Sequence, residues 1–144
     1  MDRLLHQVRC GPTFLRQPET AQLVLDSIDY GAVLGQYALH SWVIMPNHVH
    51  LLITPLVHPS RLLGSLKAAT AKRANQLLGR TGQAFWQDES YDHLVRNREE
   101  FRRIQLYIEN NPVTAFLVAT AEGYPWSRAG RPERPPQAEG LPHF

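Results

Sequence analysis

Two histidines, His48 and His50, lie two positions apart in the stretch HVHLLIT, which we predict to be a β-strand. Because side chains alternate across a strand, both imidazoles point to one face and Val49 points to the other. Imidazoles about 7 Å apart along a strand can converge on one divalent cation if a third ligand arrives from elsewhere. The same spacing suits an ordinary polar sheet face, so the pair alone leaves both interpretations open.

A tyrosine and an asparagine, Tyr107 and Asn111, lie four positions apart in a predicted helix and therefore project from the same side of it. An asparagine carbonyl is a hard oxygen donor suited to Mg²⁺ or Mn²⁺. A phenol is a competent nucleophile once it is deprotonated or held beside a metal-polarised phosphate. A half-buried packing role for the tyrosine is the alternative, and the spacing does not separate the two.

A β-hairpin and a helix must position these side chains. Pro46 and Asn47 are turn residues between two runs of β-forming residues, which predicts an antiparallel hairpin. The sequence from Asn97 to Glu100 has the pattern of a capping box at the start of the helix that carries the tyrosine. Pro112 is expected to end that helix and to begin another. Strands interleaved with helices, with a hairpin among them, indicate an α+β fold in which helices pack against a small antiparallel sheet. The predicted strands are 36–45, 48–54, 84–87 and 91–95, and the predicted helices are 18–29, 60–78, 98–110 and 112–121.

The composition of the whole chain agrees with one ordinary globular domain. It has 144 residues, of which 43% are hydrophobic and 19% charged, enough to bury a core without disulfide bonds. The single cysteine, Cys10, excludes an internal disulfide and a multi-cysteine zinc site and favours a reducing compartment. No apolar run approaches the roughly 20 residues of a membrane span and no signal peptide is evident, so we expect a soluble cytosolic protein. We expect residues 1–126 to form this domain and residues 127–144, rich in Gly, Pro and Arg, to form a disordered tail.

Several motifs together resemble one protein family. The stretch from Trp42 to Thr54, WVIMPNHVHLLIT, strongly resembles the histidine–hydrophobic–histidine (HUH) signature of single-tyrosine transposases. The stretch YIENNPV, which begins at Tyr107, also resembles that family. The same is true of three shorter stretches, which are Phe85-Trp86-Gln87, Tyr91-Asp92 and Trp126-Ser127. The resemblance is greatest to REP-associated tyrosine transposases and extends from about residue 8 to residue 128.

This resemblance implies a fold, an activity and a set of site residues. It implies a small antiparallel sheet with helices, a divalent metal (Mg²⁺ or Mn²⁺) held by His48, His50 and Asn111, and Tyr107 as the nucleophile. The implied reaction is cleavage and strand transfer of single-stranded DNA through a 5′-phosphotyrosine intermediate, on hairpin-forming repetitive palindromes. The implied partner is single-stranded or hairpin DNA, and the implied location is the bacterial cytoplasm, in association with the nucleoid. The resemblance leaves open whether two chains form a homodimer.

A basic segment is the expected contact for the DNA backbone. Between Ser60 and Ala84 there is no Asp or Glu, although the whole chain carries a formal net charge of only +2. Lysine and arginine side chains on this helix could neutralise phosphates, and an ordinary solvated helix face is the alternative. Phe85 and Trp86 could stack on bases, but we favour core positions for them, and we leave Asp92 out of the ligand set. The expected DNA-binding residues are Lys67, Lys72, Arg73 and Arg80.

The sequence departs from the resembled family at its start. Family members begin with a strand rich in β-branched and aromatic residues, whereas residues 1–9 lead into Cys10-Gly11-Pro12 without such a run. We therefore expect this strand to be missing, which would expose unpaired backbone groups. A truncated relative could bind hairpin DNA without cutting it, and this is the main alternative function. A metalloenzyme acting on small molecules is another, against which the basic helix argues.

Overall fold

The two strands predicted around Pro46 and Asn47 form the expected hairpin. In the computed structural model, which describes residues 2–132, strand β2 (Tyr37–Met45) pairs antiparallel with strand β3 (His48–Pro55). Met45 pairs with His48 directly across the turn. The hairpin therefore begins β3 with the first of the two histidines.

The expectation of a missing N-terminal strand is wrong. Strand β1 (Arg3–Cys10) is present and lies inside the sheet, between β3 and strand β4 (Trp86–Val95). Its backbone pairs antiparallel with both neighbours. Only one of its residues, Val8, is β-branched, and its polar and charged residues concealed the alternation of side chains that a strand requires.

Strand β4 is continuous, where two short pieces were expected. It completes a four-stranded antiparallel sheet in the order β2-β3-β1-β4. Most of its side chains are exposed because it pairs, within the described residues, on one side only. Polar residues such as Asp88 and Ser90 are ordinary on such an edge strand, and they made the middle of the strand look like a loop.

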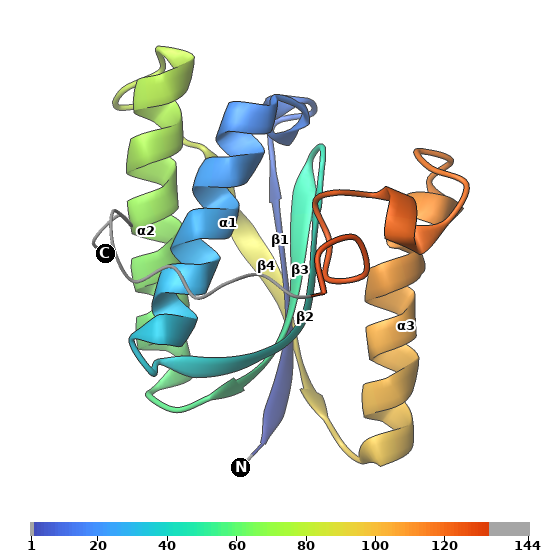
Figure 1. The fold of residues 1–144 in the computed structure, drawn as a ribbon. Coiled ribbons are helices and arrows are strands. Elements are labelled where there is room, and N and C mark those ends of the chain that lie inside the picture. Colours follow the sequence, from blue (N-terminus) through green and yellow to red (C-terminus); the bar gives the residue numbers. More distant parts are fainter. Residues whose placement is uncertain (1, 133–144) are drawn as a thin grey trace.

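Two helices cover one face of the sheet and a third covers the other (Figure 1). Helices α1 (Pro18–Val33) and α2 (Pro59–Leu78) pack against each other on one face, and helix α3 (Arg98–Thr114) lies on the opposite face, mainly over β2. A short 3-10 turn, η1 (Phe14–Arg16), connects β1 to α1. The predicted α+β class, an antiparallel sheet with helices packed against it, is confirmed. In the part of the chain that the structure covers, no helix combines the length and apolar character needed to span a bilayer.

Helix α3 continues through Pro112, so the separate helix predicted from this residue does not form. Pro112 lies in the last turn, where its missing N–H removes a single intrahelical hydrogen bond. The chain leaves the helix at Phe116, whose φ is 61°, and the Leu117 amide donates to the Pro112 carbonyl at 2.9 Å. An irregular segment then leads to a second 3-10 turn, η2 (Ala121–Gly123).

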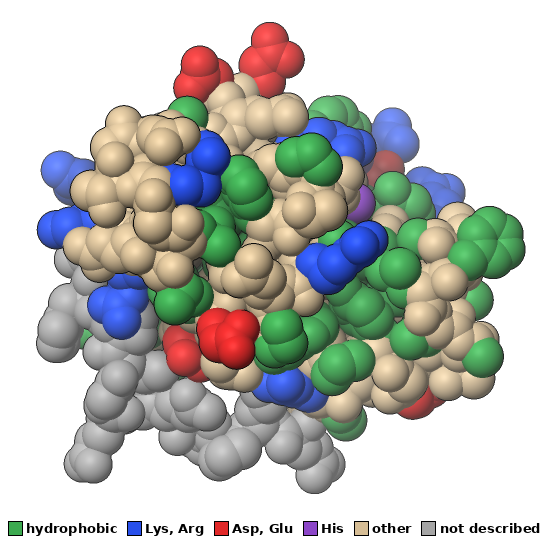
Figure 2. Space-filling model, turned by 90° about the horizontal axis from the view of Figure 1, so that it is seen from above, with side chains coloured by type: hydrophobic (Ala, Val, Ile, Leu, Met, Phe, Trp, Pro, Cys, Tyr) green, Lys and Arg blue, Asp and Glu red, His purple; other side chains and the backbone are tan. Residues whose placement is uncertain are grey.

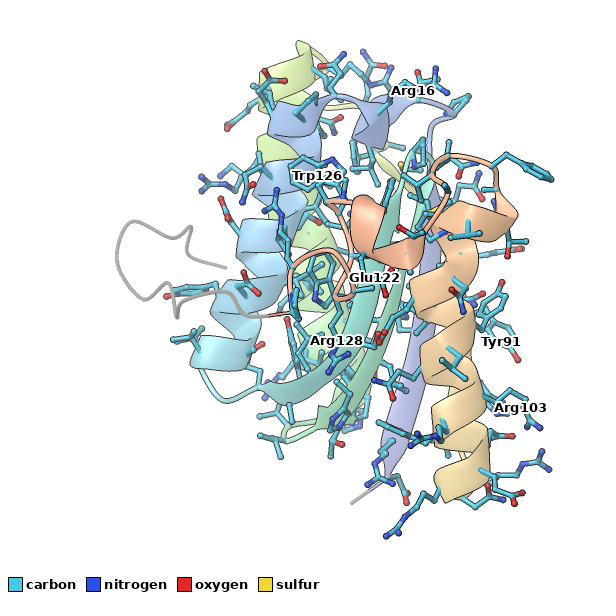
Figure 3. The ribbon with its side chains drawn as sticks, turned by 45° about the vertical axis from the view of Figure 1, so that its right-hand side comes forward. Arg16, Tyr91, Arg103, Glu122, Trp126 and Arg128 are labelled. Carbon is cyan, nitrogen blue, oxygen red and sulfur yellow. The ribbon has the colours of Figure 1, made fainter. Side chains whose placement is uncertain are left out.

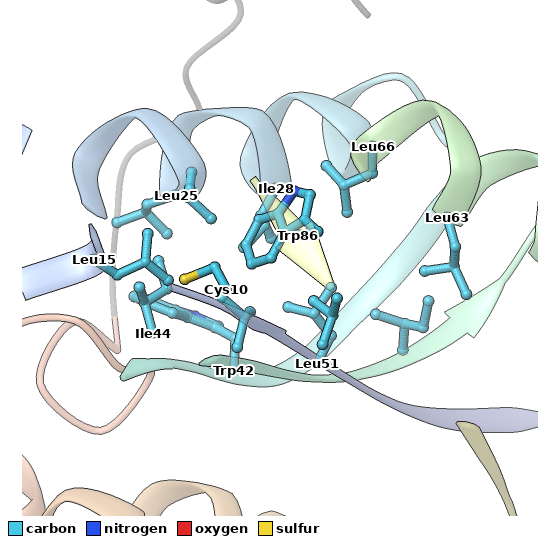
Figure 4. Packing of buried hydrophobic residues seen from close by; sticks show 14 of the residues in the cluster. Cys10, Leu15, Leu25, Ile28, Trp42, Ile44, Leu51, Leu63, Leu66 and Trp86 are labelled. Atoms are coloured by element: carbon cyan, nitrogen blue, oxygen red, sulfur yellow. The ribbon is translucent and has the colours of Figure 1, made fainter. Parts of the chain in front are cut away.

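Each face of the sheet has its own apolar core. The cluster under α1 and α2 is large and contains both Trp42 and Trp86 (Figure 4). Consecutive residues of β3 serve different cores, because Leu51 belongs to this cluster and Leu52 to the one under α3. The α3 face is only partly filled with apolar side chains, which leaves room there for polar groups. The buried members of this smaller cluster are Leu5, Val43, Met45, Leu52, Ile108 and Tyr124.

The segment that follows η2 pairs with the outer edge of β2. The Ile44 amide donates to the Trp126 carbonyl at 2.8 Å, and the Arg128 amide donates to the Trp42 carbonyl at 3.1 Å. Ser127, between these two contacts, is fully buried. The domain boundary expected after residue 126 thus falls inside a packed segment, and residues 133–144 of the expected tail lie outside the described residues.

Ending the chain after residue 126 is expected to lower the free energy of unfolding by about 2 kcal/mol relative to ending it after residue 132, because each net hydrogen bond contributes roughly 0.5–1.5 kcal/mol. The shorter chain loses the backbone bond from Arg128 to Trp42 and the ion pair of Arg128 with Glu109. Urea unfolding of the two truncated chains, followed by circular dichroism, measures the difference. Equal transition midpoints would contradict a stabilising role for this segment.

Candidate active site

His48 and His50 point to the α3 face of the sheet, as the alternation of the strand predicted. The residues between and after them, Val49 and Leu51, belong to the core under α1 and α2. The two imidazole rings meet edge to face, with their centroids 4.6 Å apart. His50 is 3% exposed, and His48 is partly exposed. The strand therefore holds two imidazoles in contact, one of them buried and the other partly exposed to solvent.

The ring nitrogens of the two histidines differ in their partners. Nδ1 of His48 lies 2.6 Å from Oδ1 of Asn47, and since this oxygen only accepts, Nδ1 donates and Nε2 keeps its lone pair. Both ring nitrogens of His50 are buried without a hydrogen-bond partner in residues 2–132. Leaving a buried polar atom unpaired costs about 1–3 kcal/mol. Coordination of a cation would satisfy His50, so the pair fits a divalent metal.

Burial favours the neutral form of both imidazoles. Loss of solvation lowers the pKa of His48 to about 4, and the positive charge of Arg9 adds to this effect. The pKa of His50 falls to about 3, first through burial and then through His48 and Arg9. Metals bind neutral imidazole, so both histidines are in their metal-binding form at neutral pH.

Tyr107 lies beside His50 of the same chain. The centroids of their rings are 5.7 Å apart, and the rings meet edge to face at 84°. The tyrosine is 54% exposed, whereas the next residue, Ile108, is fully buried against the sheet. Burial of Ile108 fixes the side of α3 that faces the strands, and this orientation places the phenol next to the histidines and open to solvent.

Asn111 follows Tyr107 by one turn on the same side of α3, as predicted, and its side chain is partly buried. Within the described residues, no group of three or more His, Cys, Asp and Glu side chains is arranged to hold a metal ion. A cation at His48 and His50 would therefore take its other ligands from amide, water or substrate oxygens. Asn111 carries an amide oxygen of the kind that Mg²⁺ and Mn²⁺ accept.

Polar contacts hold the middle of α3 in place. The Ser41 hydroxyl of β2 donates to Oε2 of Glu109 at 2.8 Å, and the Arg128 guanidinium donates to the same oxygen at 3.2 Å. Figure 3 shows the segment that carries Trp126 and Arg128 between α1 and α3. Glu109 comes two residues after the tyrosine, so these contacts help to set how closely the phenol approaches the histidines.

The N-terminus of α3 is attached to the end of β4 through Glu100. The side chain of Asn97 accepts a hydrogen bond from the Glu100 amide at 2.9 Å, the N-cap that the sequence pattern predicted. The Glu100 carboxylate accepts from the amide and guanidinium of Arg96 and pairs with Nε2 of His93 at 2.9 Å. These hydrogen bonds stabilise the ionised carboxylate and lower the pKa of Glu100 to about 2. The bonds from Arg96 have the largest effect, and the bond with His93 adds to it.

A groove beside the histidines is lined in part by Gln7 and Arg9, two residues that the sequence analysis did not single out. Gln7 and Arg9 of β1 pair with His50 and His48 across the sheet, and Tyr91 of β4 lies beyond Gln7. The groove has a volume of about 330 Å³. It is open because α3 packs mainly over β2 and leaves this part of β1 and β4 uncovered. Alternation along the first strand was the signal that could have identified these residues.

The basic residues expected to contact DNA are not gathered at the histidines. Lys67, Lys72 and Arg73 belong to α2, which covers the opposite face of the sheet. Arg80 lies beyond the C-terminus of α2, with its guanidinium 4.6 Å above the ring centroid of Phe14. Of the four residues, Arg80 alone is close to the loops around the β2–β3 turn.

Two further interpretations are decided by burial and pairing. Phe85 and Trp86 are 4% and 9% exposed and belong to the core under α1 and α2, which confirms the preferred core positions. Asp92 of β4 pairs with the buried His6 on that same face. Asp92 is therefore separated from the histidine pair by the sheet, which supports leaving it out of the ligand set.

Comparison with known proteins identifies the family to which this chain belongs. A model of the family described as IS200-like transposases matches residues 19–111, well over half of the chain, and the match includes both histidines, Tyr107 and Asn111. The chain belongs to the IS200-like transposase family. This result confirms the resemblance found in the sequence. Among curated protein sequences, none matches this chain.

Two solved structures share the fold of this IS200-like transposase. A REP-associated tyrosine transposase bound to a REP hairpin matches with a TM-score of 0.71 at 20% sequence identity, over 99% of this chain and 88% of that one. A putative transposase from Deinococcus radiodurans R1 matches with a TM-score of 0.53 at 24% identity, over 76% of this chain and 89% of that one. At these identities the comparison establishes a common fold.

Glu100→Gln in this IS200-like transposase is expected to lower thermal stability at pH 7, with a difference from the unchanged protein that shrinks as the pH falls from about 4.5 toward 2. The pKa of Glu100 is lower in the folded state than in the unfolded state, so folding favours the ionised carboxylate. Its stabilisation is complete above the unfolded pKa and is lost as the pH falls through the folded one. Thermal unfolding of both proteins across this range is the measurement, and a difference that stays constant would contradict a role for the charge.

Proposed function

We propose that this chain is a DNA transposase that cleaves and rejoins single-stranded DNA through a covalent 5′-phosphotyrosine at Tyr107. His48, His50 and Asn111 would hold a divalent cation, Mg²⁺ or Mn²⁺. The observation that carries the proposal is the meeting of the exposed phenol of α3 with the buried, unpartnered imidazole of His50, with ring centroids 5.7 Å apart. Membership of the transposase family supports DNA as the substrate.

The residues around the histidines prepare the site for its metal. Asn47 accepts the Nδ1 hydrogen of His48, so the lone pair that can bind a cation is on Nε2. Burial keeps His48 and His50 neutral, and Asn111 offers an oxygen on the side of α3 that also carries Tyr107. A bound cation would polarise the scissile phosphate and neutralise the charge that develops on it in the transition state.

Tyr107 supplies the nucleophile for this reaction. Its phenolic oxygen forms a bond to phosphorus while the bond from phosphorus to the 3′-oxygen of the preceding nucleotide breaks. The phenolic proton passes to solvent and the departing 3′-oxygen takes up a proton, which gives a 5′-phosphotyrosine and a free 3′-hydroxyl. A 3′-hydroxyl can later attack the same phosphorus and release the tyrosine, so the DNA is rejoined without an external energy source.

Hairpin-forming repetitive palindromes are the class of DNA that the proposal favours. The structurally similar REP-associated tyrosine transposase is bound to a REP hairpin. In this chain, the groove beside the histidines offers Gln7 and Arg9 to a substrate, and Arg9 can pair with a phosphate. A hairpin with unpaired nucleotides beside its stem would present a cleavable phosphate to this groove.

The presence of β1 removes the reason for expecting a relative that binds DNA without cutting it. That alternative depended on a missing strand, and the strand lies inside the sheet. Gln7 and Arg9 reach the groove only because β1 pairs beside β3. We therefore propose that the protein cleaves the DNA that it binds.

Tyr107→Phe is expected to abolish the covalent protein–DNA adduct without changing the fold, because phenylalanine keeps the ring contact with His50 and lacks only the attacking oxygen. The protein is incubated with a single-stranded repetitive-palindrome oligonucleotide and Mn²⁺, and the adduct is sought on a denaturing gel. Tyr30→Phe on α1, on the other face of the sheet, is the matched control and should form the adduct normally. An adduct in Tyr107→Phe would refute the assignment, and hairpin binding without an adduct in the unchanged protein would favour the non-cleaving alternative.

His50→Ala is expected to weaken Mn²⁺ binding by at least about tenfold, the loss usual even for residues that only support a metal ligand. Titration of Mn²⁺ followed by electron paramagnetic resonance measures this affinity in the absence of DNA. His58→Ala is the control, since His58 is exposed at the start of α2. Equal affinities of the two variants would place the metal elsewhere.

A further inference from the structure

The segment that follows α3 places an aromatic side chain in solvent. Phe116, two residues after the end of the helix, is 94% exposed, which is the largest exposure among the big apolar side chains of the described residues. Burial of a phenylalanine side chain is ordinarily favourable. The fold therefore gains nothing from the hydrophobicity of this ring.

The backbone of Phe116 also adopts a conformation that suits glycine. Its φ of 61° makes it the only non-glycine residue with a positive φ in residues 2–132. The other two long helices are each followed by a glycine in this conformation, Gly35 after α1 and Gly79 after α2. Glycine is usual there because a Cβ is strained in the left-handed region. Helix α3 is thus followed by a residue that is costly in both its backbone and its side chain.

Phe116 lies at the end of the molecule that carries the histidine pair. The β2–β3 turn, which leads directly into His48, and the segment after α3 are at the same end of the sheet (Figure 1). Phe116 comes nine residues after Tyr107, about 13 Å along the helix axis at a rise of about 1.5 Å per residue. Figure 2 looks onto this end, where Lys and Arg side chains lie next to exposed apolar side chains. DNA whose phosphate lay at Tyr107 would reach Phe116 within a few nucleotides.

The surroundings of Phe116 favour contact with a base over contact with a phosphate. The C-terminal end of α3 carries the negative end of the helix dipole, and its last turn contains no basic residue. The ring of Phe116 is a flat apolar surface of the kind on which bases stack. The adjoining Leu117 is 42% exposed, but such a pair is small beside the contiguous apolar patch that a protein partner requires.

A single open ring suits the end of a base-paired stem. An unpaired base has two free faces, and the almost complete exposure of Phe116 shows that no wall of the described protein stands opposite its ring. The base pair at the foot of a hairpin stem has one face covered by the next pair and only the other face open. One aromatic ring is enough to cover that face.

We propose that Phe116 is the platform on which the last base pair of a hairpin stem stacks, at the foot from which the single strand leaves toward Tyr107. The inference rests on the proposed function and names the residue that holds the end of the stem. The strained turn after α3 presents the ring to solvent. Relief of this strain and loss of the platform therefore occur together in Phe116→Gly.

Binding is tested in the Tyr107→Phe protein without added metal, so that no strand is cleaved. In this background, Phe116→Gly is expected to bind a blunt repetitive-palindrome hairpin about tenfold more weakly in fluorescence anisotropy, the size of effect that base stacking produces. Its melting temperature should be no lower, because glycine accepts the positive φ. Phe116→Trp should keep the affinity. Leu106→Ala, which removes a side chain that is 57% exposed on the same helix, is the matched control and should keep it too.

Two further comparisons separate stacking from other contacts. The ratio of the affinities with and without Phe116→Gly should stay constant between about 50 and about 200 mM salt, because only a phosphate contact releases counterions. A dumbbell DNA, in which a second loop closes the foot of the stem, offers no open base pair. It should bind the Tyr107→Phe protein about tenfold more weakly than the blunt hairpin does, and Phe116→Gly should bind both DNAs equally.

The proposal is overturned if Phe116→Gly keeps its affinity for the blunt hairpin, if the loss shrinks with salt, or if both proteins distinguish the dumbbell equally. A lower melting temperature of Phe116→Gly would also overturn it, because Phe116 would then serve the fold. A loss seen only with a hairpin that carries unpaired nucleotides would contradict stacking on the stem. None of these results depends on cleavage, so a missing adduct in the Mn²⁺ assay would count against the proposed function alone.

Discussion

The alternation of side chains across a single sheet is the constraint on which every functional feature of this protein depends. Along β3, Val49 and Leu51 enter the large core under α1 and α2, while His48 and His50 turn to the other face. Because the larger core supplies most of the apolar burial, the α3 face needs only a small hydrophobic cluster. It can therefore accommodate buried polar groups, including an imidazole whose desolvation must be offset by the rest of the fold.

Helix α3 meets the sheet through three interactions of different kinds, spread along its length. Glu100 links its first turn to β4, Glu109 joins its middle to β2 and the C-terminal segment, and Ile108 enters the smaller core. Ile108 and Glu109 project from other sides of the helix than Tyr107 and Asn111, and Glu100 lies on the same side as Tyr107 but two turns before it. The phenol is thus held in position by its neighbours while its own surface stays open to a substrate.

The parts of the fold that local sequence encodes were predictable. The hairpin around Pro46, the facing of His48 and His50 and the N-cap at Asn97 all follow from short-range rules, and the structure has all of them. The relation of Tyr107 to the histidines was predictable only through family resemblance, since no local rule brings α3 to β3.

The features that sequence reasoning missed depend on distant partners. Strand β1 carries His6 into the interior, which is tolerable because Asp92 of β4 pairs with it, and nothing near His6 in the sequence reveals that partner. Pro112 lacks only the N–H that would donate to the Ile108 carbonyl in the preceding turn, and the helix tolerates this loss and continues to Thr114. The basic segment of α2 was visible in the sequence, but charge along a helix does not indicate which face of a sheet the helix will cover.

The C-terminal segment also determines whether the sheet can grow. The outer edge of β2 is occupied by Trp126 and Arg128, and the other edge, β4, carries the acidic residues Asp88 and Glu89, which oppose pairing with a further strand. A strand from another chain that added beside β2 would have to displace Arg128, and Glu109 would then keep only its hydrogen bond from Ser41. Extension of the four-stranded sheet of the described residues on this side would therefore weaken the attachment of the helix that carries Tyr107.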